Sequence, residues 1–546
     1  MILNINDKIG IGVLQKPKFA NNINDFSMNS YDIVIMGGGH NALVAASYLG
    51  KAGKKVLLLE KNDYLGGATT SQRVFPDYDA QLSRYSYLMS LFPTQIFREL
   101  GLNLPLLPRK IASFTPYWQA NQNKGLLISN ENEGISRQSI LDLGFGISEW
   151  NGYQTLCQKA LKLAELTWDS FLQPLESKAV WRERFEQLGE LELWQEMIEM
   201  PIGLLLEKHV QSDLLRGVLM TDAKIGSFTS AHDPSLLQNR TYLYHVVGNK
   251  TGEWRVPQGG MGNLAQQLIE KAISAGVNLQ TEATVEAVEV GEEWHRVQYR
   301  QGGKETVVKA RYVLMSALPP QFRWISGQPI TDQDEGTAFK INLLLKKLPQ
   351  LKAPNIDPKA AFAGTFHINQ GYEQMEKSFA QAAAGVMPTV FPCEMYCHTL
   401  TDPSILSPEL QQKGYQTLTV FGIDMAYRLF TENAEARKKA VIERFFEGIN
   451  AYLAEPLQAC LAQNADGTPC IEAKSAVDLE KELGMVRGSI FHGQLSWFFA
   501  EMPQQTGSWG VETLYDRIYL CGSAALRGGA VSGIAGRNAA MKILGF

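Results

Sequence analysis

Residues 31–49 read YDIVIMGGGHNALVAASYL, so that a short apolar run, a glycine cluster and a row of small residues follow one another directly. The apolar run at 33–36 predicts a buried strand, and residues 42–49 predict a helix of small side chains. A second apolar run, residues 56–60, predicts the next strand. Strand, glycine turn, helix and strand over residues 31–60 are typical of an α/β fold with a parallel sheet covered on both faces.

The glycine cluster matches a dinucleotide-binding fingerprint. Gly37, Gly39 and Ala42 fit the spacing G-x-G-x-x-G/A directly after a strand. Gly37 permits the tight turn, Gly39 leaves room for a pyrophosphate beside the backbone, and Ala42 allows close contact between helix and strand. The first helical turn, with His40 and Asn41, offers unpaired N–H groups to phosphates, and we interpret His40 as a local hydrogen-bonding residue. The alternative is a glycine-rich turn that binds nothing.

Two further features extend this half-site. Glu60 ends the second predicted strand, where a carboxylate accepts hydrogen bonds from ribose hydroxyls and favours a free 2′-hydroxyl. Gly66 and Gly67 follow shortly after, at a point where a chain that passes close to an extended dinucleotide needs to omit side chains. The pair favours a flavin over a nicotinamide dinucleotide, although a glycine doublet by itself is more often an ordinary turn.

A similar pattern returns at the C-terminus. Residues 518–521 predict a strand, residues 522–536 a glycine-rich turn, and residues 537–544 a helix. If this unit packs beside the first one, the positive end of its helix faces the redox ring and stabilises negative charge there. The alternative is a surface helix with a glycine-rich entry.

Composition and charge exclude several classes of protein. The chain has 546 residues, 45% of them hydrophobic, and a formal net charge of −5 without a long block of one sign, which argues against nucleic acid as a partner. Six cysteines form no CxxC pair, so we expect free thiols and neither a disulfide reductase nor a metal site, including at Cys393, Cys397 and His398. The absence of targeting and membrane-spanning patterns favours the cytoplasm, and peripheral membrane contact stays open.

Five blocks of sequence carry a resemblance to a known family. They are GGGHNALVAASYL (37–49), GEWRVPQGGMGNL (252–264), FKINLLL (339–345), GSIFHGQLS (488–496) and CGSAALRGGAVSGIAGRNAA (521–540). Together they resemble the phytoene desaturase-like branch of FAD-dependent proteins with the amine oxidase fold. Because the blocks run from residue 31 to the C-terminus, the resemblance covers nearly the whole chain.

The resemblance implies FAD as the cofactor and a set of contacts to it. The implied residues are Gly37, Gly39, His40, Asn41 and Ala42 at the pyrophosphate, Glu60 at the ribose, Gly66 and Gly67 along the cofactor path, Val285 beside the adenine, and Gly522, Ser523, Gly529, Ala530 and Val531 at the ribityl phosphate and ring. Two positions depart from the family pattern. Ala42 replaces the usual glycine, and residues 526–527 read Leu-Arg where relatives usually read His-Pro.

The resemblance also implies a domain organisation. We expect a loosely held extension over residues 1–29 and a discontinuous Rossmann-type FAD-binding domain over residues 30–110, 250–320 and 485–546. An α+β substrate domain is expected over residues 111–249 and 321–484, with a helical insertion at 137–220 in which Leu156, Ala160, Leu163 and Leu166 share a face and Pro174 ends a helix. No pattern specifies an oligomeric state.

The predicted function is that of an enzyme, an FAD-dependent oxidoreductase acting on a small hydrophobic, isoprenoid or carotenoid-like substrate by desaturation, saturation or isomerisation. Hydride transfer from an allylic carbon needs an apolar tunnel, which residues 84–89, 491–492 and 497–499 are suited to line, although such residues are often ordinary core. The candidate catalytic groups near the ring are Arg84, His492 and Arg527. Each has an alternative role: Arg84 pairs with Asp79, His492 is a core imidazole, and Arg527 contacts phosphate. The alternative function is a flavin-binding regulatory or scaffold protein with little turnover.

Overall fold

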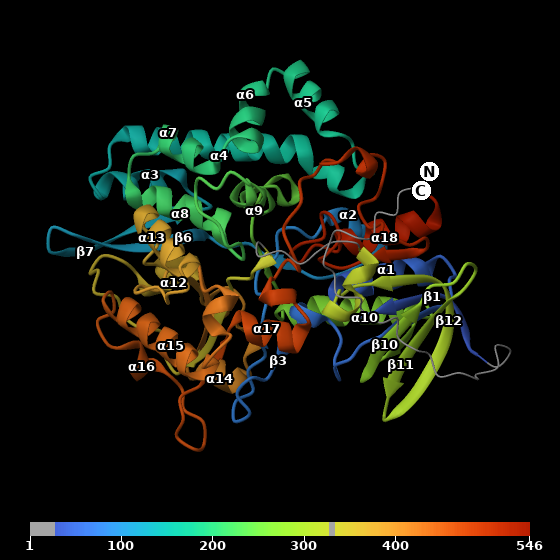
Figure 1. The fold of residues 1–546 in the computed structure, drawn as a ribbon. Helices are drawn as coiled ribbons and strands as arrows, with labels where there is room; N and C mark the ends of the chain where they lie inside the picture. Colours follow the sequence, from blue (N-terminus) through green and yellow to red (C-terminus); the bar gives the residue numbers. More distant parts are fainter. Residues whose placement is uncertain (1–27, 327–333) are drawn as a thin grey trace.

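A computed structural model describes residues 28–326 and 334–546. The described chain is built on two seven-stranded sheets. In Figure 1 the first sheet lies at the right, the second lies at the lower left among the orange helices, and a layer of helices covers the top. The predicted extension over residues 1–29 falls outside the described residues except for Met28 and Asn29.

The first sheet has a parallel core. Its strands are β1 (Ser30–Met36), β2 (Val56–Leu59), β9 (Asn278–Gln280), β18 (Ile518–Leu520) and the second half of β12 (Lys304–Met315), in the order β18-β12-β1-β2-β9. The four apolar residues of β2 are all buried, as expected for a strand covered on both faces. The βαβ unit predicted at residues 31–60 is therefore confirmed, and the C-terminal strand joins the same sheet.

An antiparallel extension continues this sheet on one side. β10 (Ala283–Glu289) pairs with β11 (His295–Gln301), and β11 pairs with the first half of β12. β12 thus pairs antiparallel with β11 before it pairs parallel with β1, which joins the antiparallel strands to the dinucleotide-binding core.

Three helices cover the parallel core: α1 (His40–Lys51), α10 (Met261–Ser274) and α18 (Ile534–Leu544). α1 packs against both of the others and every residue except Lys51 is buried. The contact with α18 depends on glycine, because a Cβ on Gly536 would lie 2.0 Å from the Asn41 carbonyl oxygen. α18 begins at Ile534, three residues before the predicted start, so Gly536 belongs to the helix and not to the turn.

The second sheet collects strands from two distant segments. Its order is β17 (Ile471–Lys474), β13 (Phe339–Leu345), β16 (Gln416–Gly422), β15 (Cys393–Tyr396), β14 (Thr365–Ile368), β6 (Ile111–Gln119) and β7 (Gln122–Ser129). The block FKINLLL at residues 339–345 forms β13. The sequence did not predict the β6–β7 hairpin, which reaches this sheet by a parallel pairing with β14.

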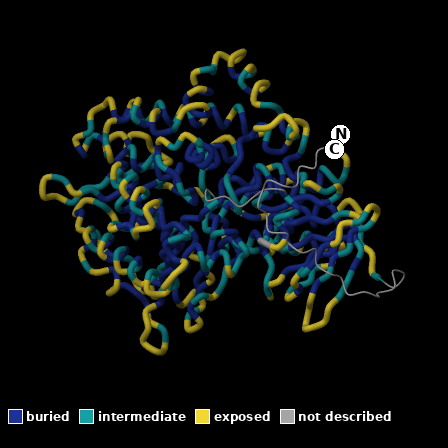
Figure 2. Tube along the Cα trace, in the orientation of Figure 1, coloured by how far each residue is buried: buried dark blue, intermediate teal, exposed yellow. Residues whose placement is uncertain are grey.

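Helices between β7 and β8 (Val256–Pro257) form the upper layer of Figure 1. They run from α3 (Glu133–Asp142) and α4 (Ile147–Thr167) to α8 (Asp213–Lys224) and α9 (Leu237–Val246). The predicted inward face of α4 is buried at Leu156, Ala160 and Leu163, while Figure 2 shows exposed residues along the outer side of this layer. α4 ends at Thr167 and a 3-10 turn (Trp168–Leu172) follows before Pro174.

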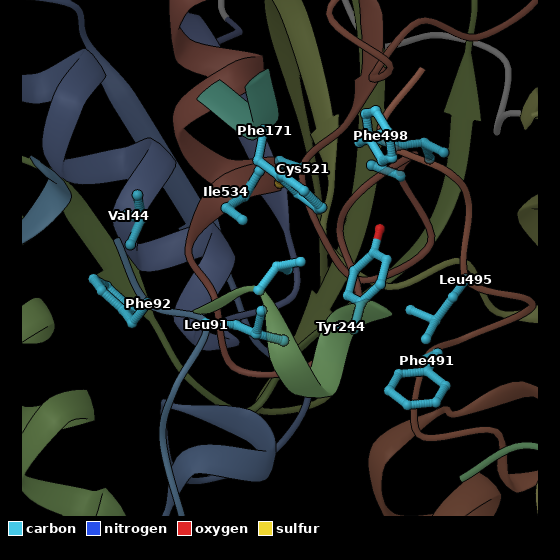
Figure 3. Packing of buried hydrophobic residues seen from close by; sticks show 14 of the residues in the cluster. Val44, Leu91, Phe92, Phe171, Tyr244, Phe491, Leu495, Phe498, Cys521 and Ile534 are labelled. Atoms are coloured by element: carbon cyan, nitrogen blue, oxygen red, sulfur yellow. The ribbon is translucent and has the colours of Figure 1, made fainter. Parts of the chain in front are cut away.

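One hydrophobic core joins the helical layer to the first sheet. Figure 3 shows side chains from α1, α9, α18 and the segment before β18 packed together. The rings of Phe171 and Tyr244 meet edge to face with centroids 5.5 Å apart, and both belong to this core. No helix in residues 28–326 and 334–546 has the length and apolar character needed to cross a membrane.

Candidate functional site: one cavity between the two sheets

A cavity of about 450 Å³ is lined by residues of both sheets and of the helical layer. Its lining includes Met36 and Leu59 at the ends of β1 and β2, Glu394 and Phe421 from the second sheet, and Asp222 from α8. The carboxyl ends of parallel strands form the usual ligand-binding edge of an open α/β sheet. The cavity therefore begins at the dinucleotide-binding edge and extends to the second sheet.

The glycine turn lines the first part of this cavity. Residues 37–41 all contribute to the lining, and Gly39 is the N-cap of α1. The first turn of α1 contains no acidic residue and the cap makes no side-chain hydrogen bond, so its first N–H groups have no capping partner. A Cβ on Gly39 would have only Ser316 Oγ within 4 Å, at 3.5 Å. The space beside Gly39 is thus open to a phosphate group.

Glu60 is fixed at the end of β2. Its Oε2 accepts a hydrogen bond from the Gly38 N–H at 2.6 Å, and its Oε1 accepts one from the Asn62 N–H at 2.9 Å. The carboxylate lines the cavity, as does Val285, where β10 carries a β-bulge. Position 38 is tightly packed, because a Cβ there would lie 2.4 Å from Leu65 Cδ2 and 3.1 Å from Glu60 Cβ, so that Leu65 would have to move. The turn, the acid and β10 together fit the pyrophosphate and adenosine half of a dinucleotide.

The predicted cofactor residues divide into two groups. Those that line the cavity are Gly37, Gly39, His40, Asn41, Glu60, Gly67, Val285, Ser523, Ala530 and Val531. Those outside the lining are Ala42, Gly66, Gly522 and Gly529. The structure therefore brings residues from the start, middle and end of the chain to one cavity.

The predicted residues outside the lining support it by close packing. A Cβ on Gly522 would lie 1.8 Å from the Ser316 carbonyl oxygen, and one on Gly66 would lie 2.7 Å from Ala265 Cβ. Gly529 is similarly crowded, since its Cβ would meet Leu495 Cδ2 at 2.3 Å. These glycines let neighbouring segments approach one another around the cavity.

Two neutral histidines face the same cavity. Burial lowers the pKa of His40 to about 4, and it lowers the pKa of His492 to about 4 as well. His40 Nε2 and His492 Nδ1 are buried and lack a hydrogen-bond partner among the described residues. His492 also adopts a left-handed backbone conformation with φ of 59°, which is uncommon for a residue with a side chain.

The other two predicted catalytic residues lie elsewhere. Arg84 does not line the cavity: its Nε donates to Glu472 Oε1 at 2.8 Å and its Nη1 donates to Gln72 Oε1 at 2.6 Å. The partner of Arg84 is thus Glu472, and the alternative pairing with Asp79 is wrong. Of the three predicted catalytic residues, His492 alone lines the cavity.

Arg527 is fully buried outside the cavity lining. Its guanidinium donates to the carbonyl oxygens of Ser170 at 2.7 Å, Gln173 at 2.8 Å and Trp509 at 3.0 Å. Burial lowers its pKa to about 10. This arginine ties the turn after α4 to the segment before β18, which differs from both the catalytic role and the phosphate contact considered from the sequence.

The predicted tunnel residues reach the cavity in part. Tyr85, Tyr87, Leu88 and Phe491 line it, whereas residues 497–499 belong to the hydrophobic core beneath it. Further apolar lining comes from Leu91, Ile225, Tyr244, Trp254, Phe421, Leu479, Leu483, Met485 and Ile490. The part of the cavity beyond the dinucleotide edge is therefore largely apolar.

Sequence reasoning missed the polar end of the cavity, which we define as Arg109, Asp222, His245, Thr365 and Glu394. Burial raises the pKa of Asp222 to about 7, against a smaller opposing effect of Arg109. Burial also raises the pKa of Glu394, which accepts a hydrogen bond from the Tyr87 hydroxyl at 2.7 Å. Each of these residues stands alone in the sequence, far from the glycine motifs.

Lys340 is a further buried polar group of the lining. Burial lowers its pKa to about 7, and its Nζ donates to the carbonyl oxygens of Ser83, at 3.1 Å, and Tyr85. A lysine within the mostly apolar strand FKINLLL was the one signal from which this residue could have been identified.

The cysteines offer no redox pair. All six are free, and burial raises the pKa of both Cys393 and Cys397. Buried thiols with raised pKa values are poor nucleophiles. Within the part of the chain that the structure describes, no group of three or more acidic, histidine or cysteine side chains is arranged to hold a metal ion.

Comparisons with known proteins agree with this geometry. A model of the NAD(P)-binding Rossmann-like domain matches residues 35–100. An uncharacterised protein of Mycobacterium tuberculosis is 41% identical over 526 residues, covering 94% of this chain and 97% of that protein. Pyridine nucleotide-disulfide oxidoreductase domain-containing protein 2 of Rattus norvegicus is 30% identical over 560 residues, covering 93% of this chain and 92% of its own length.

The fold is also known from solved structures. A variant of putrescine oxidase superposes with a TM-score of 0.57 at 16% sequence identity, covering 95% of this chain and 99% of that one. At this level of identity the likeness concerns the fold alone. It confirms the predicted architecture, a Rossmann-type dinucleotide-binding domain combined with a second α+β domain of the amine oxidase type.

Proposed function

The chain belongs to the family of pyridine nucleotide-disulfide oxidoreductase domain-containing protein 2, and from this premise we propose that it is an FAD-dependent oxidoreductase acting on a hydrophobic substrate. One observation carries the proposal. A single cavity is lined at one edge by the glycine turn, Glu60 and Val285, and further on by apolar side chains that include Phe421 of the second sheet.

The residues fit an FAD molecule better than a nicotinamide dinucleotide alone. Ser523, Ala530 and Val531 come from the C-terminal unit and line the same cavity as the glycine turn. A long dinucleotide whose ring reaches past the first sheet accounts for contacts from both ends of the chain. When bound, FAD supplies the acceptor for a hydride.

The protein's own part in the reaction is to position the substrate and to shield it from water. The apolar lining excludes water from the substrate and places it beside the ring. Ala530 and Val531 lie shortly before α18, whose first turn has no acidic residue and no side-chain cap. The positive end of this helix therefore stabilises negative charge that develops in the cavity. His492, held neutral by burial, offers a hydrogen bond at the same wall.

The substrate class follows from the lining. The aromatic and aliphatic side chains beyond the glycine turn suit a hydrophobic chain or ring system, as the desaturase resemblance implies. Desaturation passes a hydride from a substrate carbon to the flavin and releases a proton from the neighbouring carbon, saturation is the reverse and needs the reduced flavin, and isomerisation combines the two. A flavin-binding protein with little turnover remains the contrasting hypothesis.

The test begins with the purified full-length protein. We expect a flavin absorption spectrum, release of FAD on heat denaturation, and bleaching of the flavin when isoprenoid or other lipid extracts are added without oxygen. Mass spectrometry of the extract then identifies the oxidised product. Folded protein that is colourless and takes up no FAD would contradict the proposal, and bound FAD that no extract reduces would favour the scaffold hypothesis.

A further inference from the structure

The polar end of the cavity contains two carboxyl groups from different elements. Asp222 comes from α8 in the helical layer, and Glu394 comes from β15 in the second sheet. The charge of Asp222 contributes to the raised pKa of Glu394, so the two groups are close enough to influence each other. Both are partly exposed and line the cavity, so a ligand bound in the cavity can contact them.

Neither carboxyl group is ion-paired with the described residues around it. Asp222 has no hydrogen-bond partner in residues 28–326 and 334–546, and Glu394 receives one hydrogen bond, from the neutral Tyr87 hydroxyl. Buried carboxyl groups elsewhere in the described chain have either a cation or two backbone donors: Asp424 lies 3.0 Å from Lys224 Nζ and Glu335 pairs with Arg428, whereas Glu60 and Glu149 each accept two backbone N–H bonds. Asp222 and Glu394 therefore differ from the structural carboxylates of the same fold.

Two of the three Lys and Arg residues in the cavity lining, Arg109 and Lys340, are engaged elsewhere, and the third, Lys61, directly follows Glu60 at the dinucleotide edge. Arg109 donates from Nε to the Trp254 carbonyl oxygen at 3.0 Å and from Nη1 to Thr365 Oγ1 at 2.8 Å. Lys340 donates to two backbone carbonyl oxygens and lies over the Tyr87 ring, 4.7 Å from its centroid. Arg109 lowers the pKa of Asp222, yet burial outweighs it. His245 is neutral because burial lowers its pKa.

A buried carboxylate without a counter-ion is costly, so the group either takes up a proton or is stabilised by an opposite charge at hydrogen-bond distance. When both acids are ionised, the one nearby arginine leaves the polar end short of one positive charge. The aromatic side chain of Trp254 also lines this part of the cavity, and aromatic faces attract cations. A ligand that brings one cationic group on an apolar body complements both features.

We propose that the substrate is a hydrophobic amine, whose ammonium group binds between Asp222 and Glu394 while its apolar chain extends along the cavity towards the dinucleotide edge. This inference rests on the proposed function, because it takes the substrate to occupy that same cavity. An alcohol of equal length fits less well, since a hydroxyl group satisfies one acceptor and leaves the missing charge unsupplied.

Binding calorimetry on the full-length protein as purified tests the inference without requiring turnover. The probes are decylamine, decanol and decanoic acid, all below their micelle concentrations. We expect decylamine to bind at least about tenfold more tightly than decanol, which corresponds to about 1.4 kcal/mol. Equal or weaker binding of the amine would overturn the inference.

Two variants locate the site. Asp222→Asn and Glu394→Gln keep the size of each side chain and remove its charge, so each is expected to reduce decylamine affinity at least about tenfold while decanol affinity stays within about twofold. Asp169→Asn is the matched control, because the Asp169 side chain is 76% exposed outside the cavity lining and is expected to change neither affinity. An amine preference that survives both cavity variants would also overturn the inference.

The outcome separates the inference from the proposed function. Protein that carries FAD but prefers decanol contradicts the amine site and leaves the oxidoreductase proposal standing. Protein that lacks FAD yet shows an amine preference dependent on Asp222 contradicts the oxidoreductase proposal and supports the amine site. Circular dichroism of each variant confirms that the fold is kept before affinities are compared.

Discussion

The Gly38 N–H donates a hydrogen bond of 2.6 Å to the Glu60 carboxylate, across 22 residues of sequence. This bond joins the turn after β1 to the end of β2. A carboxylate that accepts from a backbone N–H forms a charge-assisted bond, stronger than a neutral one. The acid that is suited to bind a ribose is therefore oriented by the same turn that is suited to bind the phosphates.

We expect Glu60→Gln to weaken both the turn and nucleotide binding. Glu60 accepts from two backbone N–H groups, those of Gly38 and Asn62, whereas an amide has one oxygen and turns its NH₂ group towards the other donor. A buried N–H left unpaired costs about 1–3 kcal/mol. Urea unfolding of the FAD-free protein measures this loss, and an FAD titration measures the change in affinity.

A conservative change of an exposed acid gives the reference. Glu131→Gln removes a charge at an exposed position and is expected to leave unfolding free energy and FAD affinity near those of the wild type. If Glu60→Gln and Glu131→Gln unfold at the same urea concentration, the two hydrogen bonds of Glu60 do not stabilise the turn.

Gly39 offers a graded test of the phosphate position. Its backbone conformation, with φ of −68°, is open to any residue, and a Cβ there meets no protein atom closer than 3.5 Å. We therefore expect Gly39→Ala and Gly39→Val to fold, with FAD content reduced in the first and lost in the second, because the added carbons fill phosphate space. Flavin absorbance per folded protein measures this content.

A substitution at position 38 serves as a comparison, because the added carbon there meets the protein itself. Gly38→Ala places a Cβ 2.4 Å from Leu65 Cδ2, so this variant is expected to lose stability through packing within the protein. Gly39→Val is expected to lower the melting temperature of the FAD-free protein only modestly, through the poorer helix N-cap, because no protein atom blocks the added side chain at its Cβ. A full yellow complement in folded Gly39→Val protein would place the phosphates elsewhere.

The sequence was sufficient to predict the site residues that lie close together along the chain. The turn at residues 37–42 and Glu60 are recognisable because strand, glycine spacing and acid occur within one βαβ unit, and the structure brings these elements together as expected. Val285 and the C-terminal unit followed from the family resemblance and line the same cavity. Neither inference depended on knowing the three-dimensional arrangement of the second sheet.

The polar end could not be predicted because long-range packing assembles it. Asp222 is one acid on an amphipathic helix and Glu394 one acid on a short strand, and nothing in the sequence pairs positions 172 residues apart, as 394 minus 222 gives. Arg527 was misjudged for the same reason. Its position beside a glycine run suggested the ring, whereas the carbonyl groups that hold it come from residues 170, 173 and 509.

We expect Arg527→Leu to destabilise the fold and leave FAD binding intact. The change leaves three buried carbonyl groups without their donor, those of Ser170, Gln173 and Trp509, at a total cost of several kcal/mol, on the order of 3–5. Thermal unfolding measures the loss, and flavin content per folded molecule measures binding at a temperature below the transition.

Arg527→Lys and Arg137→Leu complete the set. Lysine keeps the charge but is a single point donor, so it is expected to recover only part of the stability. Arg137 is exposed, and its replacement is expected to have little effect. Folded Arg527→Leu protein that lacks FAD would show instead that this arginine supports the cofactor.

Asp222 makes the free energy of unfolding depend on pH. Its pKa is raised from 3.8 to about 7 in the folded state because burial disfavours the charged form. Between these values the folded state binds more protons than the unfolded state, so the free energy of unfolding falls as pH rises from about 4 to about 7, by at most about 1.4 kcal/mol per pH unit for one group. The contribution is fully present below the unfolded pKa and is lost above the folded one.

Replacing the Asp222 carboxyl group removes its contribution to the pH dependence of the unfolding free energy. We expect the FAD-free Asp222→Asn variant to gain stability relative to the wild type as pH rises, with the difference growing between about pH 4 and pH 7 and constant above that. Urea unfolding of both proteins at several pH values gives the difference directly, and groups that titrate alike in both, such as Asp424 with its pKa near 6, cancel.

Glu394 and Arg109 face Asp222 in the cavity, and because the Asp222 charge raises the pKa of Glu394, the variant keeps a smaller slope from Glu394. Parallel curves for the two proteins across this range would mean that Asp222 is already ionised in the folded state, and its charge would then need a counter-ion that the surrounding side chains do not provide.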